Sequence, residues 1–159
     1  MEDRCIVVGV DGSEGSRLAL RWALREARYR GDAIKAVAAW HWEEFDEGLL
    51  DPTGRRAAED DARRTLDREI DLALAEWPDE PPPLRREIAE GSPADVLVRA
   101  AEGTEMLVLG SHGHGRFRHA TLGSVGEKCV RSATCPVVIL PLPHRQRGRA
   151  RHSSAEAVG

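Results

Sequence analysis

The sequence predicts an α/β fold of the Rossmann-like kind: an open five-stranded parallel sheet in the order 3-2-1-4-5, with helices on both faces. Short apolar segments alternate with longer amphipathic segments along the chain, a pattern typical of parallel strands joined by crossover helices. Glycine-rich polar loops follow the first and the fourth apolar segments. Ligands of open α/β sheets bind beyond the carboxyl ends of the strands, where the winding reverses. If both loops face one ligand, the first and fourth strands are neighbours and the strand order follows.

The first half of the chain contains two predicted strands and two predicted helices. Arg4–Val10 is a mostly apolar, β-branched run, as expected for a strand buried on both faces. The sequence "DGSE" then offers Asp11 as the N-cap of a helix that ends at Gly31, and Ala33–Ala39 is the second strand. A long helix begins near Arg55. Its apolar stripe, at spacings of three and four residues, consists of Ala58, Ala62, Leu66, Ile70, Leu74 and Trp77.

The second half repeats the alternation of strand and helix. Residues 84–91 form a third strand whose charged residues favour a position near an edge of the sheet. Ser92 as cap and Pro93 at the first helical position are a strong start signal, and Gly103 ends that helix. The remaining predicted elements are a strand over 105–110, a helix over Ser124–Ser132 and a strand over 135–141.

Composition favours one globular domain over residues 1–142, followed by a basic, disordered tail over 143–159. The 159 residues are 41% hydrophobic and 31% charged, and no apolar run approaches the roughly 20 residues that span a bilayer. No secretory signal is visible, so we expect a cytoplasmic protein. Before the last 16 residues the chain has 19 basic and 26 acidic residues, a net charge of −7, which disfavours nucleic-acid binding. Binding through the arginine-rich tail is the alternative.

Cysteine usage argues against a disulfide framework or a thiolate zinc site. Cys5, Cys129 and Cys135 are an odd number and include no CxxC pair. We expect Cys5 in the first strand and Cys129 in a helix, each as a small apolar side chain.

The loop "GSHGHGRFRHATLGS", from Gly110 to Ser124, is the most informative segment. It has four glycines in 15 residues, and glycine lets backbone N–H groups approach an anion without a Cβ in the way. The loop returns at Gly123 to begin a helix, whose N-terminus attracts negative charge. This chemistry suits a phosphate group.

Two common phosphate motifs do not match the sequence. The Walker pattern requires GK[ST], and the only lysines are Lys35 and Lys128. The stretch "GHGRFR" has arginine where a dinucleotide fingerprint requires its third glycine, and it follows the fourth strand rather than the first.

The spacing that remains, Gly110-x-x-Gly113, nine residues and then Gly123-Ser124, resembles the G-2x-G-9x-G-[S/T] signature of universal stress proteins, in the subgroup that binds ATP. "IVVGVDGSEGS" and "GSVGEKCVRSATCPVVIL" are similar to the first strand and turn and to the last helix and strand of that family. The resemblance covers residues 3–141. It implies an ATP-binding module that acts as a nucleotide-dependent switch in a stress response.

The resemblance also implies roles for particular residues. Asp11 would bind the ribose, or the phosphates through Mg²⁺, and Ala39 would offer its backbone to the adenine edge. The last strand would form a homodimer, which also covers an exposed apolar edge. The residues expected around the nucleotide are Gly9, Val10, Asp11, Ala39, Leu109, Gly110, Ser111, Gly113, Gly123, Ser124 and Val125. The residues expected at the dimer edge are Val137, Val138, Ile139 and Leu140.

Several alternatives stay open at this stage. Asp11 can be explained as a helix cap alone, and "SVGE" makes Ser124 a capping box with Glu127. A histidine metal site in the loop has little rigid support. A slow Mg-dependent ATPase or phosphotransferase in the same cleft is the alternative function, although no catalytic base or lysine clamp is evident, and no catalytic residue is assigned. The three histidines of the loop are His112, His114 and His119.

Overall fold

The computed structural model describes residues 4–42, 52–114 and 122–143. The acidic stretch 43–51, the basic arm of the glycine-rich loop with Arg116, Arg118 and His119, and the tail from residue 144 lie outside the described residues. Within the described part, no helix is both long and apolar enough to cross a membrane.

Five parallel strands form one sheet in the order β3-β2-β1-β4-β5, as predicted. Its topology reverses between β1 and β4, and β3 and β5 are the edges. The strands are β1 (Cys5–Gly9), β2 (Ala33–Trp40), β3 (Leu84–Glu90), β4 (Met106–Gly110) and β5 (Val137–Leu140). The helices are α1 (Glu14–Arg30), α2 (Pro52–Ala75), α3 (Pro93–Ala100) and α4 (Ser124–Ser132).

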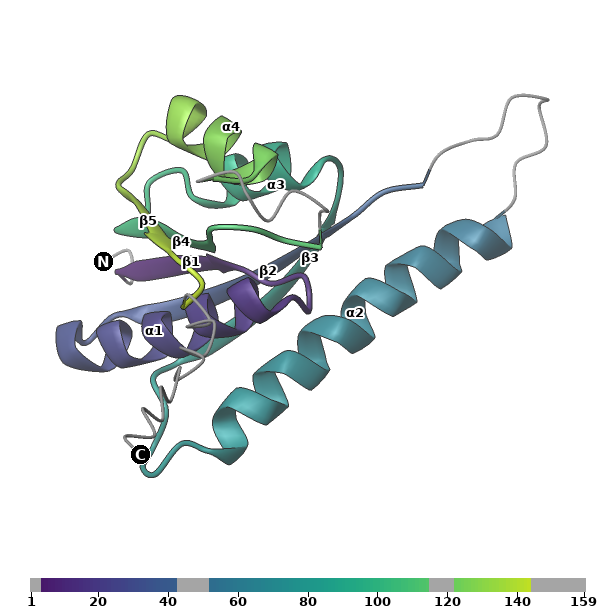
Figure 1. The fold of residues 1–159 in the computed structure, drawn as a ribbon. Coiled ribbons are helices and arrows are strands. Elements are labelled where there is room, and N and C mark those ends of the chain that lie inside the picture. The colour runs from purple at the N-terminus through teal and green to yellow at the C-terminus, as the bar shows by residue number, and fades with distance from the viewer. Residues whose placement is uncertain (1–3, 43–51, 115–121, 144–159) are drawn as a thin grey trace, which may run out of the picture.

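Two helical layers cover the sheet, with α1 and α2 on one face and α3 and α4 on the other (Figure 1). Because successive strand side chains point to opposite faces, β1 contributes Ile6 and Val8 to the first core and Val7 to the second. All three side chains are fully buried, and each such burial stabilises the fold by about 1.5–3 kcal/mol. This explains why the strands are continuous apolar runs rather than alternating ones.

A charge network ties the amino ends of the strands together, opposite the glycine-rich loops. Asp32, between α1 and β2, is 1% exposed, and its carboxylate pairs with Arg30 at 2.8 Å and with Arg4 at 3.3 Å. Both guanidinium groups also reach Glu105, just before β4. The network therefore joins β1, α1, β2 and β4 at one end of the sheet.

Two predicted helix caps are wrong by one or two residues. Ser13, not Asp11, caps α1, because its hydroxyl accepts a hydrogen bond from the Ser16 N–H at 3.2 Å. The N-cap of α4 is Gly123, so Ser124 is the first helical residue rather than the cap. Both predictions failed because capping residues follow one another in these segments, and the sequence pattern does not select among them.

The long helix and the third helix also differ from their predicted limits. Helix α2 begins at Pro52, three residues before the predicted start, since proline is well suited to a first turn. It ends at Ala75, so Trp77 packs on the core from beyond the helix. Helix α3 ends at Ala100, and Gly103 occupies the turn after it with a positive φ of 70°.

Candidate functional site

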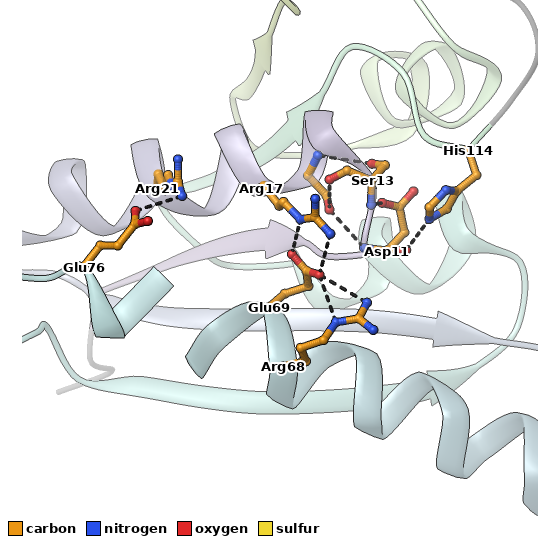
Figure 2. Close-up of polar contacts among 9 residues, drawn as sticks. Asp11, Ser13, Arg17, Arg21, Arg68, Glu69, Glu76 and His114 are labelled. Carbon is orange, nitrogen blue, oxygen red and sulfur yellow. Dashed lines mark hydrogen bonds and ion pairs between the residues drawn. The ribbon is translucent and has the colours of Figure 1, made fainter. Parts of the chain in front are cut away.

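The loops after β1 and β4 meet at the carboxyl edge of the sheet. His114 Nε2 lies 2.6 Å from the carbonyl oxygen of Asp11 (Figure 2). A Cβ added to Gly113 would lie 2.6 Å from Asp11 Oδ2. Two segments about a hundred residues apart in the sequence are therefore in direct contact where the strand order reverses, the place where open α/β sheets bind ligands.

Asp11 presents its carboxylate at this junction. One oxygen accepts a hydrogen bond from the Ser13 N–H at 2.9 Å, and the Asp11 N–H donates to Ser16 Oγ at 3.3 Å. The residue itself is exposed. Gly12, between Asp11 and Ser13, has a φ of 80°, a conformation that residues with side chains rarely adopt. The loop thus fixes the Asp11 backbone while leaving its side chain accessible to a ligand.

Two glycines allow the first helix to pack closely on β4. A Cβ on Gly110 would lie 2.5 Å from the carbonyl carbon of Gly15, and a Cβ on Gly15 would lie 2.6 Å from the carbonyl oxygen of His112. Real side chains do not fit at such distances. Gly110 is therefore required by backbone packing, whatever its part in ligand binding. Sequence reasoning missed Gly15, although "GSEGS" contains it.

Ser111 and Gly123 join the end of the sheet to the start of α4. The Ser111 N–H donates to the Leu140 carbonyl at 2.9 Å, and its own carbonyl accepts from the Gly123 N–H at 2.8 Å. No side chain of the described residues caps α4, and the N-terminus of the helix carries backbone N–H groups and the positive end of the helix dipole. Ser124 is exposed at that turn, and Val125 packs against the second core.

Near the start of α4, the imidazole ring of His112 has one nitrogen with a hydrogen-bond partner and one without. Its Nδ1 lies 3.1 Å from Ser111 Oγ. Its Nε2 is buried and has no hydrogen-bond partner among the described residues, an arrangement that costs about 1–3 kcal/mol.

The backbone N–H and C=O of Ala39 point to the side of β2 on which β1 lies, but past the last residue of β1. In a strand, the N–H and C=O of one residue point to the same side, and those of the next residue to the other. The Val37 carbonyl accepts from the Val10 N–H, toward β1, and the Trp40 carbonyl accepts from the Gly91 N–H, toward β3. Ala39 has the parity of Val37, and the last β1 residue paired with β2 is Gly9. The N–H and C=O of Ala39 are therefore directed past the end of β1, at the carboxyl edge of the sheet.

Three of the predicted site residues, Gly9, Val10 and Leu109, are buried at the ends of β1 and β4, Val10 in the first core and Leu109 in the second. Val10 and Leu109 are 3% and 5% exposed. A Cβ on Gly9 would lie 2.9 Å from Leu109 Cδ2. These residues fix the ends of the two strands, and their side chains carry no polar group that could hold a ligand.

An ion-pair cluster that the sequence did not reveal supports the first loop from the side of α2. Glu69, 2% exposed, accepts from Arg17 at 2.6 and 3.1 Å and from Arg68 at 3.3 and 3.4 Å (Figure 2). The hydrogen bond from Arg17 is the main reason why the pKa of the Glu69 carboxyl is lowered. A Cβ on Gly12 would lie 3.5 Å from Arg68 Nη2, so the cluster lies beside Gly12, the residue that follows Asp11.

The contacts of the lysines and of the acidic groups limit how a phosphate ligand and a metal ion could be held at this edge of the sheet. Lys35 Nζ binds the Ala100 carbonyl at 2.7 Å, and Lys128 pairs with Asp95 at 2.7 Å, so both side chains are engaged elsewhere. Within the described residues, no group of three or more His, Cys, Asp and Glu could hold a metal ion. The exposed Asp11 carboxylate suits an ion such as Mg²⁺ that takes most of its ligands from phosphate and water.

An open five-stranded parallel sheet in the order β3-β2-β1-β4-β5, covered by helices on both faces, defines the Rossmann-like class of α/β proteins. Within that class, the chain belongs to the universal stress protein family, whose model matches residues 4–141. It is 35% identical over 147 residues to the universal stress protein Rv1996 of Mycobacterium tuberculosis, an alignment that covers 87% of this chain and 44% of that protein. The chain thus spans less than half the length of that relative.

Solved structures of this family share the fold. The universal stress protein UspA from Lactobacillus plantarum is 20% identical, with a TM-score of 0.73 over 88% of this chain and 99% of that one. The universal stress protein from Archaeoglobus fulgidus in complex with dAMP is 24% identical, with a TM-score of 0.62 over 87% of this chain and 98% of that one.

Proposed function

We propose that this protein binds ATP, with Mg²⁺, in the crevice between β1 and β4 and acts as a nucleotide-dependent binding module in a stress response. The observation that carries the proposal is the contact between the Asp11 loop and the Gly113–His114 segment, 2.6 Å from His114 Nε2 to the Asp11 carbonyl. It brings the Asp11 carboxylate to the backbone of Gly113, and the hydrogen bond from the Gly123 N–H to the Ser111 carbonyl holds the start of α4 beside the same loop. The related A. fulgidus protein was solved with dAMP, an adenine nucleotide.

Adenine would be recognised by the end of β2. The Ala39 carbonyl would accept from the exocyclic amino group, and the Ala39 N–H would donate to a ring nitrogen. Guanine has a carbonyl where adenine has its amino group, so the Ala39 carbonyl would face another acceptor. Leaving buried polar groups without partners is an effective way to reject a ligand. Asp11 would bind the ribose hydroxyls or, through Mg²⁺, the phosphates.

The phosphates would lie at the N-terminus of α4. Gly113 and Gly123 bring backbone close, Ser124 adds a hydroxyl, and Val125 adds an N–H of the first turn. Hydrogen bonds to charged groups contribute about 1.5–3 kcal/mol each. A few of them, with burial of the base, reach the roughly −8 kcal/mol of micromolar binding.

A slow Mg-dependent ATPase in the same cleft is the second candidate, and the lysines argue for low turnover. Efficient phosphoryl transfer uses a lysine on the phosphates, whereas Lys35 and Lys128 are bound to Ala100 and Asp95. We therefore favour a switch over an efficient enzyme.

We also propose that two copies associate through β5. Strand β5 pairs only with β4 among the described strands, and Val137, Val138, Ile139 and Leu140 are all partly exposed. An apolar edge of this kind is stabilised when another chain covers it. Sedimentation of the protein and of a Val138→Lys variant tests this, since the charge should give monomers.

The binding proposal is tested by calorimetric titration of the nucleotide-stripped protein with ATP and GTP in the presence of Mg²⁺. We expect micromolar ATP binding and at least about 10-fold weaker GTP binding. Ser124→Ala should weaken ATP binding, while Ser132→Ala, at the opposite end of the same helix, serves as the control. Equal affinity for ATP in both variants and the parent would show that the Ser124 hydroxyl does not contact the nucleotide, and no ATP binding by the folded parent would refute the proposal.

A further inference from the structure

His112 has a buried nitrogen for which the described residues supply no partner. The atom is Nε2, and the other ring nitrogen, Nδ1, lies 3.1 Å from Ser111 Oγ. Buried polar groups in native proteins are nearly always hydrogen-bonded, so an exception calls for an explanation such as an absent ligand or water. His114 is different, because its Nε2 already pairs with the Asp11 carbonyl.

Ser111 fixes the position of the His112 ring. It is 5% exposed, and its backbone is bonded on both sides, to the Leu140 carbonyl and to the Gly123 N–H. With Ser111 held in this way, its hydroxyl is a fixed partner for Nδ1. When the hydroxyl donates to Nδ1, the proton of a neutral imidazole is on Nε2.

The unpartnered nitrogen lies at the start of α4. A Cβ on Gly123, the N-cap, would be 4.0 Å from His112 Cδ2, and Cδ2 is the ring carbon bonded to Nε2. Within the part of the chain that the structure describes, the first turn of this nine-residue helix has no side-chain cap, and a helix N-terminus favours anions. One phosphate oxygen placed there could accept from both the helix and the imidazole.

We propose that His112 is a specificity-determining residue of the nucleotide site, whose Nε2–H donates a hydrogen bond to a phosphate oxygen and so favours nucleotides over nucleosides. This inference rests on the proposed function. Ser111 is the positioning residue that selects the required tautomer. The ligand completes a hydrogen bond that the chain leaves unmade, so binding gains from the interaction and from satisfying a buried donor.

Two substitutions separate the two ring nitrogens. The amide of His112→Asn reaches the position of Nδ1 and keeps a partner for Ser111, but it has nothing at the position of Nε2. The longer His112→Gln places an amide near the position of Nε2. Ser132→Ala, at the far end of α4, is the control for handling and folding.

Calorimetry with ATP and with adenosine is the main test. We expect His112→Asn to bind ATP about 10- to 100-fold more weakly than the parent, to bind adenosine equally well, and His112→Gln to recover most of the loss. If His112→Asn binds ATP within about 2-fold of the parent, the inference is wrong while the proposed function stands. If the folded parent binds no ATP, both are wrong.

Nitrogen NMR of the histidine rings gives a readout that a purely structural role would not change. We expect a proton on Nε2 of His112, and a shift of that nitrogen signal with ATP but not with adenosine. A proton on Nδ1, or a signal indifferent to ATP, overturns the inference. Without nucleotide, His112→Asn should melt no lower than the parent, because the unpartnered nitrogen has been removed.

Discussion

Gly110 and Gly123 belong to the same glycine signature, yet the structure gives them different physical roles. A Cβ on Gly110 would lie 2.5, 2.7 and 2.8 Å from three backbone atoms of Gly15. A Cβ on Gly123 would meet nothing nearer than the Ser111 carbonyl oxygen at 3.3 Å. We therefore predict that Gly110→Ala destabilises the fold, whereas Gly123→Ala affects mainly the ligand site.

The expected magnitudes follow from what must move in each variant. Overpacking of a well-packed interior costs typically 1–3 kcal/mol, and the neighbour of Gly110 is the backbone of α1 rather than a flexible side chain. We therefore expect about 3 kcal/mol of destabilisation for Gly110→Ala, or a melting temperature about 6–12 °C lower for a chain of this size. For Gly123→Ala a shift of a few tenths of an ångström suffices, so the loss should stay below about 1 kcal/mol.

Denaturant unfolding of the two variants and the parent, all free of nucleotide, measures the difference. The nucleotide-free state is essential, because a bound ligand would add its own stabilisation. If Gly110→Ala lies within about 0.5 kcal/mol of the parent, or if both variants lose the same amount, the packing explanation of Gly110 is refuted.

Three further predictions concern groups away from the phosphate loop. Glu69 has a lowered pKa in the folded protein, chiefly because Arg17 donates to it. Its contribution to stability is therefore present above the unfolded pKa near 4.5 and is lost as the pH falls through the lower folded value. The free energy of unfolding of Glu69→Gln should therefore depend less steeply on pH below about pH 4.5 than that of the parent. Burial raises the pKa of the Cys129 thiol to about 11; at pH 8 iodoacetamide should modify the partly exposed Cys135 well before Cys129, as read by mass spectrometry, and equal rates would contradict this. Asp32→Ala removes the buried carboxylate that Arg4 and Arg30 share and leaves both of them with Glu105, so it should cost about 1–3 kcal/mol in denaturant unfolding. An unchanged midpoint would show that Glu105 and water replace the lost pairs.

The sequence was sufficient to predict the sheet because its signals are local and agree with one another. Each strand is a short apolar run, and the two glycine-rich loops placed β1 beside β4, which the structure confirms. The caps were harder, because Asp11 and Ser13 are both good capping residues and only the backbone conformation decides between them. The hydroxyl of Ser13, not the carboxylate of Asp11, bonds the first turn of α1 through Ser16.

Contacts between distant segments could not be predicted. Glu69 and Arg17 are 52 residues apart in the sequence. Charged residues on a helix are ordinarily exposed to solvent, so nothing at either position indicates a buried ion pair. The direction of the Ala39 backbone depends on the register of three strands, and the orphaned nitrogen of His112 depends on where Ser111 is held. Glycine spacing indicated where a ligand would bind, while the packing of Gly110 on Gly15 showed that such spacing also reflects the fold.

A crystal structure of the protein grown with ATP and Mg²⁺ tests the central claim most directly. The account predicts the adenine amino group within hydrogen-bond distance of the Ala39 carbonyl, the ribose or a Mg²⁺ ion at Asp11, and the phosphates at Gly113, Gly123 and Ser124. Nucleotide bound at another place, or a crevice left empty at saturating ATP, would contradict it.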